Sequence, residues 1–511
     1  MAKKTADRLI PPANGVVVRM YRIGHGDCFL LAFPGKKADD PKYVLIDCGY
    51  KPGSPAFINT TPKEVTDNLR VATGGHIDVA IITHEHQDHV NAITKTHFKD
   101  FTIGEAWFAW TEDPDDAVAN ELRKNFKDKL LGLLAARNNL AAAGDTRAAE
   151  KIDSFLAFEF GGDQEQFNAA GAAAVFAAGL NSDNKQSMKI FKDRASKGVK
   201  FIRPHQKILK LPGVDNVRVF ALGPPRDEAL LKSLDPIGEE GFHLGVSRSA
   251  SAYFGAAARA LADGIDPQAP FDSQYSVPFN HIKDLEGETG QFFRVGYGVD
   301  GDQPVTEPTR GADEIESNAA WRRIDRDWLY SAEQLALDMG DYTNNSSLVL
   351  AFELGKDGKV LLFVADAQRG NWISWSKKSW KDGTATITAR DLLSRTVLYK
   401  VGHHGRHNAT LHGAANDEYA NLAWMAEAEH GREFVAMITA VRKWATEKAG
   451  WDHPLKGIKD ALLLRTAGRV FQTDTDVSKM KMAADGSKAD WDDFQSRTKG
   501  DTLFFDYTIQ M

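Results

Sequence analysis

The sequence predicts an α/β fold, because short apolar strands and segments of helical spacing follow one another along the chain. The run 77–83 (IDVAIIT) is almost continuously apolar over the length of a strand, which is typical of a strand covered on both faces. After Asp113-Pro114, a pair that often begins a helix, apolar residues recur at helical spacing over 122–136. Several strand-like runs end in histidine or aspartate, so polar groups are expected to gather at one edge of the sheet.

The expected strands form an N-terminal and a C-terminal group, with one pair between them. In chain order they are 16–21, 28–33, 43–47, 77–83, 207–211, 217–222, 347–353, 360–365, 396–401, 433–439, 469–472 and 502–507. Helical spacing or Ala-rich composition marks 122–136, 146–158, 168–180, 250–263, 318–337 and 455–465.

The length of 511 residues exceeds that of an average domain, so two domains or one enlarged domain are expected. We interpret residues 1–511 as a single domain, because the motifs described below lie on both sides of the less regular segments. Its core is expected at about 15–105, 200–225 and 340–511, and its insertions at about 106–200 and 226–340.

Composition narrows the class of protein. The net charge of −7 lacks the basic excess by which proteins bind nucleic acid non-specifically. The two cysteines, Cys28 and Cys48, lie in apolar runs and suit a core; a bridge between them stays open, but a secreted disulfide framework is not indicated. The chain shows no signal peptide and no apolar run of about 18 residues. We expect a cytoplasmic protein without a membrane span.

The segment 83–89 (THEHQDH) is the strongest chemical signal in the chain, and it follows the strand 77–83. On a strand end, residues two apart point the same way, so His84 and His86 can share one metal ion. Asp88 and His89 follow in the turn and can face a second ion. A solvated His-rich turn is the alternative, but so many polar groups beside an apolar strand each need a partner.

Two later strand ends offer further ligands. Asp366 ends the run VLLFVAD, and His403 and His404 follow YKVG. Alone, each would be interpreted as a turn or loop residue. Their shared position at strand ends, together with a His/Asp cluster, favours metal ligands instead.

These motifs resemble those of a known family. THEHQDH is similar to the HxHxDH signature of metallo-β-lactamase-fold hydrolases. RIGHGDCFLL, VLIDCG, the stretch from NNSSLVLAFELG to VLLFVADA, YKVGHHGRHNAT and the WDHPLKG segment resemble elements of its ComEC-type, competence-protein-like branch, here in a stand-alone form. Ala365 stands where that branch usually has glycine before the aspartate. The likeness covers roughly 15–105, 200–225 and 340–480.

The resemblance implies a metallo-β-lactamase αβ/βα four-layer sandwich with helical insertions and two divalent metal ions at the sheet edges. It implies that His84 and His86 bind one metal, that Asp88 and His89 bind the other, and that Asp366 bridges them. His403 or His404 would complete the shell.

The resemblance also implies supporting residues. Asp47 would orient the site from behind the ligands. Asp27 and His453 would lie near the rim, although a plainly structural role is equally open for both. The classical fold has one more histidine before the bridging aspartate, and the candidates in that interval, His97, His205, His243 and His281, have no convincing context.

The expected reaction is hydrolysis by a hydroxide held between the two metals. Two divalent ions about 3.5–4 Å apart lower the pKa of a bridging water and stabilise the leaving oxygen. A ligand set of His and Asp without thiolate suits zinc or manganese. Asp88 or Asp366 would move the proton.

We expect the substrate to be a phosphodiester, with nucleic acid among the candidates, which would make the chain a phosphodiesterase or nuclease. Arg406 and His407 lie beside the metal loop and could meet a phosphate. Lys377, Lys378 and Lys381 lie among Trp372, Trp375 and Trp380, which suits a single strand held by charge and stacking, or instead an exposed loop with aromatic anchors in the core.

Two other hypotheses stay open. One is a hydrolase of a small ester, lactone or phosphocholine-type substrate, which the acidic net charge favours slightly. The other is a regulatory protein with a structural metal site that binds a protein partner through its insertions. In either case, we expect the insertions to form a lid or a partner surface.

Overall fold

The computed structural model is described here over residues 8–37, 40–142, 182–204, 207–242 and 339–511, with short pieces at 149–150, 152–153, 156 and 286–288. Three of the expected helices lie outside the described residues, at 168–180, 250–263 and 318–337. Most of the helix expected at 146–158 lies outside them as well. None of the described helices combines the length and the apolar character that crossing a bilayer requires.

The described chain forms two large mixed sheets, which confirms the α/β class. The first runs in the order β16 (Thr498–Gly500), β17 (Phe504–Gln510), β1 (Gly15–Tyr21), β2 (Phe29–Phe33), β3 (Lys42–Ile46), β4 (His76–Ile82), β5 (Thr102–Ala109) and β6 (Val199–Ile202). The second runs β15 (Val470–Gln472), β14 (Val435–Ile438), β13 (Thr396–Lys400), β10 (Lys359–Phe363), β9 (Val349–Leu354), β8 (Val217–Gly223) and β7 (Leu209–Lys210).

The two sheets pack face to face, and alternation along each strand decides which side chains lie between them. In β1, Val16, Val18 and Met20 join the central core, whereas Val17 and Tyr21 lie on the other face. In β10 the central core likewise receives every second residue. Because side chains of a strand alternate between faces and both faces are covered, the strands have continuously apolar sequences.

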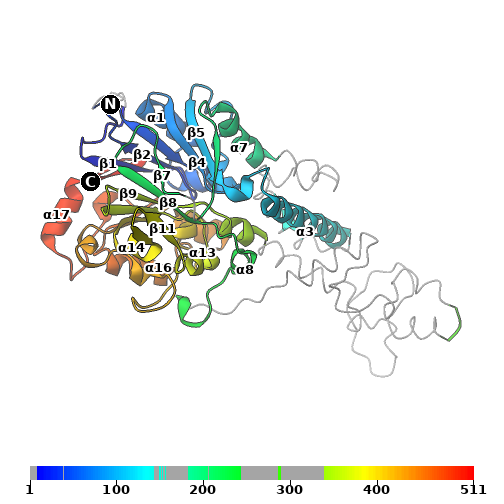
Figure 1. Ribbon diagram of the computed structural model, residues 1–511. Coiled ribbons are helices and arrows are strands. Elements are labelled where there is room, and N and C mark those ends of the chain that lie inside the picture. Colours follow the sequence, from blue (N-terminus) through cyan, green and yellow to red (C-terminus); the bar gives the residue numbers. More distant parts are fainter. Residues whose placement is uncertain are drawn as a thin grey trace.

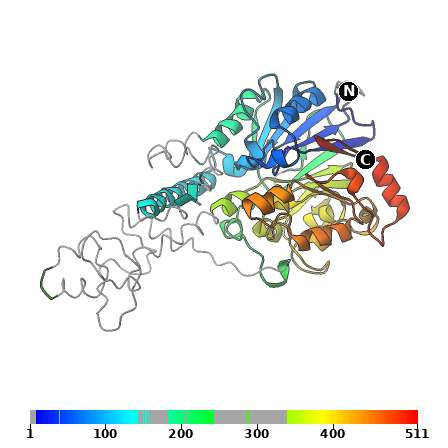
Figure 2. The same ribbon diagram turned by 180° about the vertical axis from the view of Figure 1, so that it is seen from behind.

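Helices cover both outer faces (Figures 1 and 2). On the first sheet lie α1 (Pro62–Thr73) and α7 (Asp183–Arg194); on the second lie α13 (Arg369–Trp375), α14 (Ala389–Ser394) and α16 (Lys456–Arg465). Helix α17 (Lys488–Ser496) adds Trp491 and Phe494 to the central core, and β11 (Ser379–Asp382) pairs with β12 (Ala385–Thr388) in a separate hairpin.

Helix α1 was not expected from the sequence, although its start is well marked. Pro62 occupies the first turn, and Thr61 forms a capping box with Glu64, in which each side chain bonds the other's backbone N–H. Val65 and Leu69 are buried against the first sheet. This apolar stripe of two turns is short, which is why periodicity alone does not single it out.

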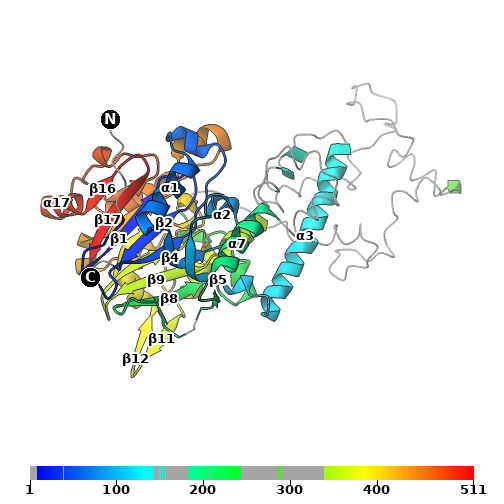
Figure 3. The same cartoon turned by 90° about the horizontal axis from the view of Figure 1, so that it is seen from above.

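The first sheet extends further than the expected core. Strands β5 and β6 lie at its edge, with α3 (Ala117–Ala142) between them in the chain, so the sheet takes in both ends of the range 106–200 that we interpreted as an insertion. Gly104 and Glu105 interrupt the apolar run of β5 and hide its strand character. Figure 3 shows α3, in cyan, standing beside the two sheets.

The tryptophans near the basic run 377–381 are core residues. Trp372 and Trp375 are fully buried, Trp380 is 4% exposed, and Lys378 is also buried. The rings are therefore not available to stack on bases, and the alternative interpretation, aromatic anchors in the core, is the one the structure contains. Cys28 and Cys48 are buried and carry free thiols.

Candidate metal centre

The predicted site residues lie where strand ends of the two sheets meet. Asp47 follows β3 and His84 follows β4, two parallel neighbours in the first sheet. Asp366 follows β10 and the His403-His404 pair follows β13, two parallel neighbours in the second. Carboxyl ends of parallel strands share one edge of a sheet, so four segments distant in sequence deliver polar side chains to one place.

One group of ligand atoms forms between the sheets. Asp88, His89, Asp366 and His404 are all buried, and each offers a ligand atom within 4.8 Å of the others. Asp88 Oδ2 lies 2.9 Å from His404 Nε2, and His89 Nε2 lies 3.3 Å from Asp366 Oδ2. Asp88 and His89 belong to the single turn α2 (Gln87–Val90), which places them next to each other.

A second pair of ligand atoms lies beside this group. His84 Nε2 is 3.0 Å from His86 Nδ1, and both rings are buried. His84 Nε2 is also 4.0 Å from Asp366 Oδ2. Asp366 therefore lies between the His84–His86 pair and the Asp88–His89–His404 side, which is the position that a bridging carboxylate needs.

The structure separates the two adjacent histidines that the sequence could not rank. His404 is in the four-residue group, whereas His403 Nε2 lies 3.6 Å from Asp366 Oδ2. Both residues adopt left-handed backbone, with φ of 40° and 55°, and so do Asp47 and Ala365, with φ of 54° and 49°. Four non-glycine residues in this conformation at one site are a local cost that the surrounding fold imposes.

Asp47 lies behind His89, as expected of an orienting residue. Its Oδ2 is 2.8 Å from His89 Nδ1, and its carboxylate accepts hydrogen bonds from the backbone N–H and the hydroxyl of Thr83. This contact directs His89 Nε2 towards Asp366. Burial raises the pKa of Asp47, and His89 acts in the opposite direction.

Asp27 is buried within the site rather than at its rim. It is 2% exposed, its Oδ1 accepts a 2.6 Å hydrogen bond from the Thr439 hydroxyl, and its Oδ2 lies 2.5 Å from Lys400 Nζ. His404 Nδ1 lies 3.0 Å from both the carbonyl and the hydroxyl of Thr439. Asp27 and Thr439 thus support His404 from behind.

Three polar residues of the site escaped the sequence interpretation. Lys400 is 1% exposed beneath Asp366, and Lys51 Nζ lies 3.5 Å from Asp88 Oδ2. His25 is fully buried, with its ring 4.4 Å from that of His404. A lysine that ends the apolar run TVLYK, and a histidine inside the GHGD turn, were the available signals.

The ring of His453 stacks on the ring of His25, with the ring centroids 5.6 Å apart. It is 9% exposed, and its ring is 5.8 Å from that of His403. Burial lowers the pKa of His25 and of His453, and neighbouring histidines or Arg406 lower both further. Both rings are therefore held neutral.

Arg406 and His407 are occupied by carboxylates of the chain. Arg406 makes a two-pronged ion pair with Asp341, and His407 Nε2 lies 3.1 Å from Asp235 Oδ1. A substrate phosphate would have to compete with these partners. Of the further histidines considered, His97 contacts the Ala92 carbonyl away from the site, and His205, His243 and His281 lie outside the described residues.

The charge states of Asp366, Asp88 and His84 favour bound cations. Burial raises the pKa of Asp366, but His403, His89, His404 and Lys400 outweigh burial and hold it well below its usual value. For Asp88, Lys51 and His404 likewise overcome burial and lower the pKa. Burial lowers the pKa of His84, and His89 and His86 lower it further, so the ring is neutral. Ionised carboxylates and neutral imidazoles are the forms that bind metals. His89 is the exception: burial lowers its pKa, but Asp366, Asp27 and Asp47 raise it by more, so this ring has to release a proton when a metal binds.

Buried atoms that make no hydrogen bond provide the direct test of fit. Among the described residues, both carboxylate oxygens of Asp366, Asp88 Oδ1 and His89 Nε2 are buried and make no hydrogen bond. Burial of such atoms is costly unless something else satisfies them. They face one another across a few ångströms and are hard or borderline donors, so they fit divalent cations such as zinc or manganese.

Comparison of the chain with models of protein families gives no match, and comparison with curated proteins gives none either.

Proposed function

We propose that the chain is a dinuclear metal-dependent hydrolase that cleaves phosphodiesters, built on a sandwich of the metallo-β-lactamase type. The observation that carries the proposal is the position of Asp366, whose two carboxylate oxygens make no hydrogen bond to the described residues and lie between two sets of ligands. The order of the layers, helices outside two facing sheets, supports the same family.

The residues divide between two metals, which we propose to be zinc or manganese. His84 and His86 would hold the first through Nε2 and Nδ1. Asp88, His89 and His404 would hold the second, and Asp366 would serve both. Apart from Asp366, the first metal would have two ligands and the second would have three. We therefore expect the first metal to be released more easily.

Bound together, two such ions activate water and stabilise charge on the oxygens of a phosphodiester undergoing displacement. The side chains of the site supply position and proton transfer. Asp47 fixes the tautomer of His89 through Nδ1, and Thr439 fixes that of His404. Asp88 Oδ1, which has no hydrogen-bond partner among the described residues, is placed to accept a proton.

Two other candidate nucleophiles lie near Asp366 in the described site, the hydroxyl of Ser347 and the amine of Lys400. The Ser347 hydroxyl lies 3.2 Å from His84 Nδ1 and accepts a hydrogen bond from the Asp366 backbone N–H, so we assign it to positioning these two ligands. Lys400 is held by Asp27 and the Ala365 carbonyl. Burial lowers the pKa of Lys400, but Asp27 and Asp366 raise it by more, so its amine stays protonated and cannot attack.

The test is cleavage that depends on metal. Purified protein is incubated with Mn²⁺ or Zn²⁺ and bis-p-nitrophenyl phosphate, single-stranded DNA or double-stranded DNA. A His84→Ala/His86→Ala variant should lose at least about 100-fold in rate, because the first metal loses its protein ligands. His430→Ala changes a histidine of the short 3-10 helix η8 (Ala428–Arg432), away from the site, and should cleave at the wild-type rate.

The outcomes separate the hypotheses. Cleavage of the small diester by the wild type and the control only would support a phosphodiesterase, and cleavage of DNA as well would extend it to a nuclease. Two bound metals without cleavage of any of the three would refute the proposal in favour of another ester or a regulatory role.

A further inference from the structure

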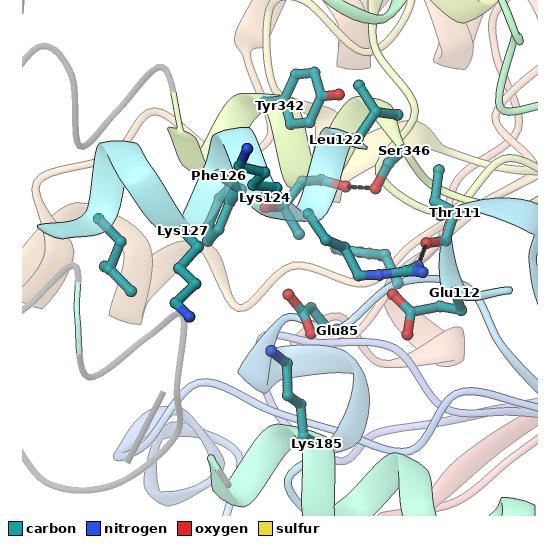
Figure 4. Close-up of a pocket in the computed structure, with 14 residues that line it drawn as sticks. Glu85, Thr111, Glu112, Leu122, Lys124, Phe126, Lys127, Lys185, Tyr342 and Ser346 are labelled. Carbon is teal, nitrogen blue, oxygen red and sulfur yellow. Dashed lines mark hydrogen bonds between the residues drawn. The ribbon is translucent and has the colours of Figure 1, made fainter. Parts of the chain in front are cut away.

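A cavity of about 410 Å³ opens directly beside the proposed first metal. His84 and Glu85 form its floor, and its walls come from α3, from η2 (Trp110–Glu112), from α7 and from the segment 342–346 (Figure 4). Its volume lies in the range of cavities that bind small molecules, about 300–1,000 Å³. The cavity reaches His84, one of the two ligands proposed for that metal.

Helix α3 is fixed to the sheets at the point where it lines this cavity. Ala119 and Leu122 pack with Trp110 and Leu231 in a small buried cluster. Arg123 donates hydrogen bonds to the carbonyl oxygens of Thr111 and Asp113. The first turns of α3 are thus part of the site, and they give this insertion a task at the reaction centre.

The lining combines an apolar wall with an excess of cations. Leu122, Phe126, Leu130 and Tyr342 supply the apolar surface, while Arg123, Lys124, Lys127 and Lys185 oppose the two carboxylates of Glu85 and Glu112. In Figure 4 the ring of Phe126 and the side chains of Lys124 and Lys127 project from the same stretch of α3. The surface therefore matches an anionic molecule that carries an apolar group.

Tyr342 adds a polar group to the apolar wall. Its hydroxyl is buried and has no hydrogen-bond partner among the described residues. Burial raises the pKa of Tyr342, with Glu228 adding to the effect, so the hydroxyl keeps its proton and can donate it in a hydrogen bond. A donor left without an acceptor in a cavity is what a bound oxygen would satisfy.

We propose that this cavity binds one ester group of a small phosphodiester, and that this group is aromatic or aliphatic. The inference rests on the proposed function, because it places the phosphate at His84. Phe126, Leu130 and Tyr342 would contact the apolar group, and Lys124 and Lys127 would attract the anion. A polymer would have to leave most of its chain outside the cavity.

Binding tests the cavity independently of catalysis. Diphenyl phosphate and dimethyl phosphate carry the same single charge and differ in the apolar group, so calorimetric titration of each into the metal-loaded protein isolates the contribution of the wall. We expect diphenyl phosphate to bind at least about tenfold more tightly. Phe126→Ala should remove most of that difference, and Lys124→Glu/Lys127→Glu should weaken both ligands.

Matched controls lie elsewhere on the molecule. Leu464→Ala removes an apolar side chain that is 68% exposed on α16, and Lys499→Glu reverses an exposed charge on β16, at the opposite edge of the first sheet from β6. Both should bind like the wild type. Thermal melts of all variants establish that any loss is not unfolding; because Lys124 and Lys127 are exposed, their variant should fold normally.

The results distinguish the two proposals. Equal affinity for both diesters, or wild-type binding by the α3 variants, would overturn the proposed role of the cavity even if bis-p-nitrophenyl phosphate is cleaved. Selective binding that the α3 variants lose would support the cavity even if no substrate is cleaved, in which case only the proposed hydrolysis fails. A ten-nucleotide single strand that binds more tightly than diphenyl phosphate, through the same residues, would overturn the small-molecule assignment.

Discussion

Lys400 Nζ lies 3.5 Å from Asp366 Oδ1, under the carboxylate that we propose to bridge two metals. The same ammonium group is 2.5 Å from Asp27 Oδ2 and donates a hydrogen bond to the Ala365 carbonyl. One buried cation thus holds the backbone before Asp366, a supporting carboxylate and Asp366 itself. Lys400 therefore supplies positive charge at the proposed metal site in addition to the charge that bound metals would supply.

Replacement of Lys400 by methionine should destabilise the fold. The change leaves Asp27 and Asp366 buried without their cation, and loss of one partner of a buried ion pair typically costs about 3–5 kcal/mol. Urea unfolding measures the loss. Saturating Mn²⁺ should restore part of it, because bound metal supplies positive charge, whereas Lys499→Met, an exposed change, should unfold like the wild type. A Lys400→Met variant as stable as the wild type would show that the pair has no such role.

Asp366→Asn should keep the fold, lose one metal equivalent and lose most activity. An amide has the shape of the carboxylate but no charge with which to hold two cations. Metal content by mass spectrometry and cleavage of bis-p-nitrophenyl phosphate measure the two effects, with Asp485→Asn as an exposed control. Full activity with two bound metals would mean that Asp366 is not the bridge.

Ala365→Gly should stabilise the protein by about 0.5–1 kcal/mol. Ala365 has φ of 49°, a conformation in which its Cβ is strained and glycine is not. The gain exceeds the greater freedom that glycine gives the unfolded chain. Ala489→Gly, in helix α17, should have the opposite sign and cost about 1 kcal/mol. Denaturant unfolding midpoints measure the stability of the two variants. Equal losses of stability would show that Ala365 is not strained.

Asp47→Asn should weaken metal binding by about 10–100-fold without removing a ligand. Asp47 contacts His89 Nδ1 at 2.8 Å, and an amide can present a hydrogen instead of an acceptor there. Competition with a coloured chelator measures the affinity. Unchanged affinity would mean that Thr83 and the packing of the ring suffice to orient His89.

Lys378→Met should stabilise the protein at neutral pH by up to about 3 kcal/mol. Burial lowers the pKa of Lys378 to about 8, so below that pH the folded protein carries a buried charge. Between pH 8 and the unfolded value of 10.5 the unfolded chain binds more protons, so the wild type gains stability as pH rises and the advantage of the variant disappears. Unfolding at pH 7 and pH 10.5 tests this, with the exposed neighbour changed in Lys377→Met as control. A gain independent of pH would indicate better packing alone.

Much of the sheet structure could be predicted because its signal is local. Continuous apolar runs such as those of β4 and β10 predict strands wherever both faces are covered, and THEHQDH predicts a metal cluster because its ligands lie within a few residues. β5 and α1 were not expected, because Gly104 and Glu105 break the apolar run of one and the other is short. Whether such a segment forms a strand or a helix depends on the neighbouring elements against which it packs.

The sequence by itself determined the α/β class, the strand ends that carry Asp47, His84 and Asp366, and the kinds of ligand they offer. Only the tertiary structure decided that His404, rather than His403, joins Asp88 and His89, that Lys400 lies beneath Asp366, and that α3 lines a cavity beside His84. The reason is physical: residue type and periodicity are properties of a short segment. The contacts between atoms of distant segments depend on how the two sheets pack. They also depend on left-handed turns, and no local sequence pattern specifies the direction in which such a turn leads the chain.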